Sequence, residues 1–169
     1  NGDLVHRMYI ELTGGADAAE EDVYNPGSFL IKTVELEIGG QKIDKHSGDW
    51  METWAELTEP NPTGAVFDAA APTQGGTLFQ KMSGMGGYDS TGHNGYLDNE
   101  KLFIPLQFWF CRNPGLALPL IALQYHEVKV ILDHRIDAVA ANADTKLWCD
   151  YIYLDTDERR RFAQVSHEY

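Results

Sequence analysis

Three histidine–carboxylate pairs are the residues of this sequence that come nearest to a metal site. They are His46 with Asp49, His126 with Glu127, and His134 with Asp137. An iron-oxygenase or cupin-like site on a strand needs a histidine and a second ligand two residues apart, because alternate residues of a strand share a face. Spacings of one and three residues place the two side chains on opposite faces. The sequence therefore predicts no metal site and no bound cofactor.

Nucleophilic and phosphate-binding chemistry are unsupported as well. A catalytic serine of the hydrolase type sits in a Gly-x-Ser-x-Gly turn, and none of the serines considered has that context: Ser28, Ser47, Ser83, Ser90 and Ser166. The glycine-rich stretch 75–95 lacks the Lys-Ser/Thr pair of a phosphate-binding loop. We therefore predict no catalytic residue and no enzymatic activity.

A cluster of acids near the end of the chain invites a calcium interpretation, which local structure explains better. Asp155, Asp157 and Glu158 are closely spaced, but the glycine and the distal glutamate of a calcium loop are missing. Asp155 followed by Glu158 has the spacing of a capping box, which begins a helix. We expect a helix start here.

Charge and cysteine content restrict the partners further. The net charge of −13 argues against contacts with a nucleic-acid backbone, which require clustered Lys and Arg. Cys111 and Cys149 both lie in apolar strand patterns, so two free thiols are favoured over a disulfide. His6, on an otherwise apolar strand face, is interpreted as a hydrogen-bonded core histidine.

The stretch from Lys101 to Leu132 is the apolar centre around which the other elements must fold. Residues 102–111 are apolar on both faces of an alternating pattern, which is typical of a strand covered on both sides. Asn113-Pro114-Gly115 breaks the pattern, and a second strand is expected over 121–132. Polar residues and three prolines interrupt the apolar run before it reaches the roughly 20 residues that a membrane-spanning helix needs. The stretch is therefore not interpreted as a membrane span.

The remaining elements complete an all-β prediction. Strands are expected at 4–12, at 29–38 and 41–45 around a Gly39-Gly40 hairpin turn, and at 146–154. A helix over 50–57, capped by Asp49 with Glu52, would lie on the sheet through Trp50, Trp54 and Leu57. Residues 58–100 are expected to form a long surface loop. About six strands indicate a jelly-roll β-sandwich that is about two strands short of eight.

One long string of residues carries a family resemblance. FIPLQFWFCRNPGLALPLIALQYHEVKV, residues 103–130, closely resembles the signature segment of the major capsid proteins of the nucleocytoplasmic large DNA viruses, the algal and iridovirus-like group. Three further segments are similar to that family in the same order: 1–11, 34–57 and 148–169. The acidic loop near 14–27 and the stretch 58–100 match it poorly.

The resemblance implies a double jelly roll, of which this chain is one part. Residues 1–155 would form the first jelly roll without its N-terminal strands, and 156–169 would start the connection to a second jelly roll. The family's homotrimers have a pseudo-hexagonal outline and tile an icosahedral shell around an internal membrane. The implied partners are further copies of the protein and minor capsid proteins, without direct nucleic-acid contact. The implied location is the virion capsid, assembled in the host cytoplasm.

A carbohydrate-binding β-sandwich of the lectin type is the alternative from a different class. Exposed aromatic side chains with polar neighbours in loops bind sugars, and Tyr88, His93 and Tyr96 could serve in that way. A lectin of this kind would leave those rings accessible to solvent.

Overall fold

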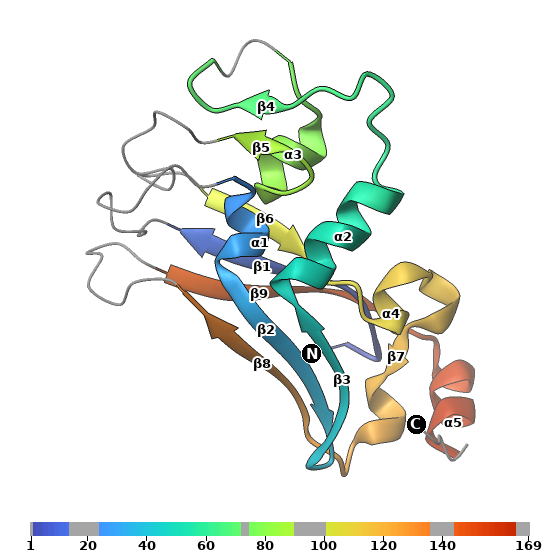
Figure 1. The fold of residues 1–169 in the computed structure, drawn as a ribbon. Coiled ribbons are helices and arrows are strands. Elements are labelled where there is room, and N and C mark those ends of the chain that lie inside the picture. Colours follow the sequence, from blue (N-terminus) through green and yellow to red (C-terminus); the bar gives the residue numbers. More distant parts are fainter. Residues whose placement is uncertain (1, 14–23, 72–74, 90–100, 136–143, 165–169) are drawn as a thin grey trace.

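Two antiparallel sheets face each other across one apolar core (Figure 1). The computed structural model describes residues 2–13, 24–71, 75–89, 101–135 and 144–164. The first sheet contains β6 (Lys101–Pro105), β1 (Leu4–Thr13) and β9 (Asp144–Ile152), and β7 (Leu118–Pro119) pairs with the start of β1. The second sheet has the order β3 (Gln41–Ser47), β2 (Ile31–Ile38) and β8 (Val128–His134). The all-β prediction is confirmed.

The core lies between the two sheets because their strands alternate in the way the sequence indicates. Ile10 and Leu12 of β1 face Val34 and Leu36 of β2 within one buried cluster. Each such side chain contributes about 1.5–3 kcal/mol when fully removed from water. The inward-facing residues of both sheets therefore share one hydrophobic interior. The residues between them along each strand point outward and form the outer face of that strand's sheet.

The turn between β2 and β3 confirms the hairpin prediction. Gly39 and Gly40 have φ of 58° and 81°. A two-residue turn with both central residues at positive φ matches the twist of the strands that it joins. Glycine adopts that conformation without the steric penalty of a side chain.

The prediction of one continuous strand over 102–111 is wrong in its second half. β6 ends at Pro105, and Trp109–Arg112 forms a helical turn, α4. Phe108 and Phe110 are both fully buried. Residues enclosed on all sides lose the periodicity that separates a buried strand from a buried helical turn. The same reason applies to 121–132, where a 3-10 turn (η2, Leu120–Leu123) precedes a strand that begins only at Val128.

The first long helix, α2 (Gly48–Thr58), is oriented differently from the prediction. Ser47 caps it, because the Ser47 hydroxyl accepts a hydrogen bond from the Trp50 amide at 3.1 Å. Met51 and Ala55 form its buried face, whereas Leu57 is 79% exposed. A Cβ on Gly48 would lie 2.2 Å from two backbone carbonyl oxygens, so the helix start packs closely against the backbone of its neighbours. That contact sets the rotation of the helix.

The stretch predicted as a loop over 58–100 contains regular structure in its described parts. α3 (Leu78–Ser83) starts with a complete capping box between Thr77 and Gln80. Two short strands, β4 (Phe67–Asp68) and β5 (Tyr88–Asp89), pair in parallel. Together with α1 (Pro26–Phe29), they lie at one end of the sandwich (Figure 1). The prediction for residues 90–100 lies outside the described residues.

The last helix, α5 (Thr156–Gln164), confirms the capping prediction. The Glu158 amide donates to the Asp155 carboxylate at 2.8 Å. Asp3 holds the other side of this region, because Arg159 donates to its carboxylate at 2.7 Å and the Leu154 amide donates at 2.8 Å. These bonds lower the pKa of Asp3 below its ordinary value, the bond from Arg159 most strongly. The helix is thereby tied to the start of β1.

Candidate functional site

The histidine–carboxylate pairs weighed as metal ligands do not converge on one point. His46 is buried in β3, and its Nε2 lies 3.3 Å from Asp44 rather than near Asp49. Nowhere in the described part of the chain do three or more His, Cys, Asp or Glu side chains gather closely enough to hold a metal ion. Asp137 lies outside the described residues. Asp44 and His46 are two residues apart on one strand, so their side chains share a face. The sequence reasoning did not consider this pair, although its spacing indicates that the two side chains can meet.

His46 belongs to a column of stacked rings that runs from the core toward the surface. Its imidazole stacks on Trp50 at 4.0 Å and on Phe108 at 5.0 Å between ring centroids. Trp50 stacks in turn on Trp54, over which the Arg112 guanidinium lies at 4.2 Å. Burial lowers the pKa of His46, and within the described structure its Nδ1 has no hydrogen-bond partner. The column thus connects β3, α2 and the residues around α4 through ring contacts.

The two cysteines and His6 behave as structural residues. Cys111 and Cys149 are both free thiols, as predicted. Burial raises the pKa of Cys111 to about 11, so the reactive thiolate is scarce at neutral pH. The Nδ1 of His6 donates to the Phe110 carbonyl oxygen at 2.9 Å, which confirms a hydrogen-bonded histidine.

Tyr88, the first aromatic residue proposed for a lectin site, is buried. Tyr88 is only 2% exposed and packs against Phe67 at 4.9 Å between ring centroids. A buried ring cannot stack on a sugar from solvent. His93 and Tyr96 lie outside the described residues.

The outer face of the second sheet is charged, and its charges are paired across strands. Glu35 accepts ion pairs from Lys42 at 2.7 Å and Lys45 at 2.8 Å, and Lys129 lies 3.9 Å from Glu37. The bonds from Lys42 and then Lys45 lower the pKa of Glu35. Such a lattice of paired surface charges is compatible with direct contact with water.

The outer face of the first sheet combines aromatic side chains with two ion pairs, Lys101–Glu11 at 3.1 Å and Lys146–Asp144 at 2.7 Å. Tyr9 of β1 stands directly opposite Pro105 of β6 and Trp148 of β9, and Glu11 stands opposite Phe103. Glu11 is buried beneath this layer, where the Trp148 indole N–H and Lys101 bond to its carboxylate and lower its pKa. Both outer faces therefore carry paired charges, and the first sheet adds aromatic side chains to them.

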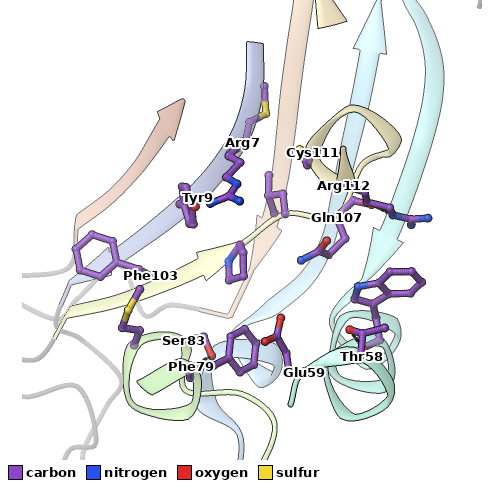
Figure 2. A pocket seen from close by; sticks show the side chains of 15 residues that line it. Arg7, Tyr9, Thr58, Glu59, Phe79, Ser83, Phe103, Gln107, Cys111 and Arg112 are labelled. Carbon is purple, nitrogen blue, oxygen red and sulfur yellow. Dashed lines mark hydrogen bonds between the residues drawn. The ribbon is translucent and has the colours of Figure 1, made fainter. Parts of the chain in front are cut away.

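A hollow of about 430 Å³ opens beside this aromatic face (Figure 2). Its wall is made by β1, the end of β6, α4, α3 and the C-terminal end of α2. Tyr9, Trp54, Phe79 and Phe103 contribute aromatic surface. The set of polar side chains that line it consists of Arg7, Thr58, Glu59, Ser83, Gln107 and Arg112. Burial raises the pKa of Glu59.

The opposite edge of the sandwich exposes apolar side chains of two edge strands. β8 and β9 each have one paired neighbour among the described strands. Trp148 is 54% exposed, Leu147 44% and Ile131 42%. Unpaired strand edges with apolar side chains are templates for pairing with further strands.

Among the described helices, we find none that has both the length and the apolar character to cross a bilayer.

Comparison with known proteins identifies the relatives of this chain. The family model described as the major capsid protein N-terminus matches residues 1–155. The major capsid protein of Pyramimonas orientalis virus is 49% identical over 176 residues, which cover 100% of this chain and 42% of that protein. The major capsid protein of Phaeocystis pouchetii virus is 41% identical over 207 residues, with 100% and 40% coverage. The chain thus spans about two fifths of these relatives.

A solved structure extends the likeness to the fold. VP54 of PBCV-1, known from a crystal structure that was fitted into a reconstruction of the virophage Sputnik, superposes with a TM-score of 0.70 at 38% identity. The superposition covers 100% of this chain and 40% of VP54. The likeness confirms the predicted jelly-roll β-sandwich.

Proposed function

Because this chain belongs to the family of major capsid proteins of large DNA viruses, we propose that it is a structural subunit that self-assembles into the shell of a virion. The subunits associate as homotrimers of pseudo-hexagonal outline, and these capsomers tile an icosahedral capsid. The role is one of assembly and not of catalysis. The observation that carries the proposal is the 49% identity to a major capsid protein over the whole chain.

The physical properties of the domain support a structural role. One apolar cluster joins both sheets, and the aromatic column locks the neighbouring helices to it. A close-packed interior of this kind transmits load instead of deforming. The net charge of −13 disfavours direct contact with nucleic acid. The partners that follow from membership of the capsid family are further copies and minor capsid proteins. Assembly takes place in the host cytoplasm, next to the internal membrane of the virion.

We also propose how the chain is placed within the longer protein. Residues 1–155 form the first of two jelly rolls, and 156–169, which include α5, begin the connection to the second. Two strands from outside this chain pair with β8 and β9 and cover Leu147, Trp148 and Ile131. The half-exposed apolar side chains at these edges support that arrangement. Without those strands, residues 1–169 expressed alone are expected to aggregate or to stay molten, and a sharp two-state melt of a soluble monomer would contradict the arrangement.

Light scattering on the full-length capsid protein tests the assembly proposal. The expected molar mass is three times that of one full-length polypeptide, and electron microscopy should show particles of pseudo-hexagonal outline. A protein that stays monomeric at the micromolar concentrations of these measurements would refute it. A glycan array run with the same sample checks the lectin alternative, for which specific retention of a sugar would be required.

A further inference from the structure

We propose that the buried carboxylate of Asp3 is a latch that fixes the direction of α5 against the first jelly roll. Because α5 begins the proposed connection to the second jelly roll, the latch also sets how the two jelly rolls are placed. This inference rests on the proposed function, since it assigns a positioning residue to the connection that was proposed there.

The first argument is that α5 has little apolar attachment of its own. Of the nine residues Thr156–Gln164, only Phe162 is partly buried and none is fully buried. An isolated helix shorter than about 12 residues is marginal in water, so contacts with the body of the protein must hold it. Hydrophobic burial supplies little of that contact here. Polar bonds at the start of α5 therefore decide its direction.

The second argument is that Asp3 bonds to three separate segments. One oxygen of its carboxylate accepts from Nε and Nη2 of Arg159 at 2.9 and 2.7 Å, and the other accepts from the Leu154 amide at 2.8 Å. Its backbone carbonyl oxygen accepts from the Ile121 amide of η2 at 3.2 Å. The Asp3 side chain is only 6% exposed, so water competes little for these bonds. Charge-assisted bonds to both oxygens of one carboxylate fix the positions of the donor groups.

The third argument is where these bonds lie along the chain. Leu154 lies just before α5, and Arg159 lies about one turn into it, so Asp3 holds the chain at two successive points. Two fixed points define an axis, whereas a single contact would leave the helix free to pivot. The residue after Asp3 begins β1, which pairs with β7 and β9. The anchor therefore belongs to the sheet, and α5 lies beside it at the end of the sandwich away from β4 and β5 (Figure 1).

A fixed connection matters for the proposed capsomer. Three copies with a pseudo-hexagonal outline place their two jelly rolls in alternate positions around one ring. A ring closes only when every copy repeats the same rotation. A connection that pivots would vary that rotation from copy to copy. The latch at Asp3 thus supplies a uniform geometry before the subunits meet.

Hydrogen exchange on the full-length capsid protein tests the latch. Arg159→Gln keeps a polar side chain and removes the charge that Asp3 binds, and Arg160→Gln, next to it and exposed in the same helix, is the matched control. We expect exchange of the amides in 156–164 to rise about fivefold in Arg159→Gln, the loss of a charge-assisted bond whose arginine is half-exposed. Arg160→Gln should exchange at the rate of the parent. Equal rates in all three proteins would overturn the proposal.

Exchange elsewhere in the same samples separates a latch from general stability. The amides of β1 and β9 should keep the rates of the parent in Arg159→Gln. A rise there by the same factor as in α5 would overturn the proposal, because the bond would then stabilise the whole domain instead of fixing one helix.

A double-mutant cycle with Asp3→Asn tests whether the two residues act as one unit. Asp3→Asn should speed exchange in α5 as Arg159→Gln does, and the double variant should exchange no faster than the faster single variant. Effects that multiply in the double variant would show two independent contributions and refute the latch.

Electron microscopy of assembled particles tests the consequence for the capsomer. The fraction of closed pseudo-hexagonal particles should fall in Arg159→Gln and stay at the level of the parent in Arg160→Gln. Full closure in Arg159→Gln despite faster exchange in α5 would refute the role in placing the jelly rolls and leave the proposed function standing. If the parent itself forms no capsomers, the proposed function fails and this inference fails with it, so the two failures are distinguishable.

Discussion

Replacing Phe108 by alanine should loosen the junction of β3, α2 and α4 more than any surface change. Phe108 is fully buried, and its ring stacks on His46 at 5.0 Å and on Phe110 at 5.8 Å between centroids. Removing a buried phenylalanine side chain costs about 3–5 kcal/mol, because transfer energy is lost and a cavity remains. Loss of the two ring contacts is part of that cost, at about 0.5–1.5 kcal/mol each.

The size of this loss matters against the total stability of a domain. A domain of this kind is stable by about 5–15 kcal/mol, so Phe108→Ala removes a large share. Phe108→Leu retains most of the apolar volume and should cost less than about 1.5 kcal/mol. Cavity size alone predicts that stability increases in the order Phe108→Ala, Phe108→Leu, parent.

Hydrogen exchange on the full-length protein measures the effect at the right place. With the second jelly roll that we propose for the longer protein, a single unfolding free energy would be ill-defined, whereas exchange reports the opening of residues 41–58 separately. Leu57→Ala is the control, since that side chain is 79% exposed and should change the opening free energy by less than about 0.5 kcal/mol. A Phe108→Ala cost below about 1 kcal/mol, or one equal to that of Leu57→Ala, would refute the role of the aromatic column.

Three further outcomes follow from buried groups nearby. Burial lowers the pKa of His46 in the folded protein below the ordinary histidine pKa of 6.5. Between these two pKa values the unfolded chain binds more protons than the folded one, so the free energy of unfolding should fall as the pH drops through 6.5 toward the folded pKa. His46→Phe should flatten this part of a denaturation series from pH 7.5 to 5, and an unchanged slope would contradict the assignment. Glu52 accepts bonds from the Ser28 hydroxyl and the Gly86 amide, both at 2.9 Å, and burial raises its pKa, so Glu52→Gln should be neutral or stabilising at pH 7. Glu52→Ala should cost about 1–3 kcal/mol for each donor left unpaired, and melting curves that rank the two variants equally would exclude the tether. Gly48→Ala should destabilise the folded protein by about 1–3 kcal/mol, because the new Cβ would lie 2.2 Å from the carbonyl oxygens of Ile31 and Ser28. A thermal midpoint equal to that of the parent would contradict this expectation and show that the helix start can shift.

Local signals explain which elements could be predicted from the residues. The strand pattern of β1, the Gly39-Gly40 turn and the Asp155–Glu158 cap all depend on neighbours a few residues away. The FIPLQFWFCRNPGLALPLIALQYHEVKV string indicated the family, and the comparisons confirm it. The fold class and the family were therefore accessible without coordinates.

Contacts between distant segments explain what could not be predicted. Phe108 to Cys111 left the strand pattern because they are enclosed on all sides, and no periodicity remains to distinguish a strand from a helical turn. The rotation of α2 depends on the backbone contact of Gly48 with residues about 20 positions earlier. Glu52 has the spacing of a capping residue, yet it bonds to Ser28 and Gly86, which only the folded chain brings near.

The sequence by itself determined that the apolar residues of 102–111 are buried, that the pattern breaks at Asn113-Pro114-Gly115, and that the chain belongs to a capsid family. Only the tertiary structure decided which distant residues meet around the hollow beside the first sheet. Arg7, Glu59 and Gln107 are up to 100 residues apart in the chain, and they meet in one hollow because the middle of β1 lies beside the C-terminal ends of α2 and β6 there. No local pattern encodes such a meeting, since it arises from the packing of whole elements against one core.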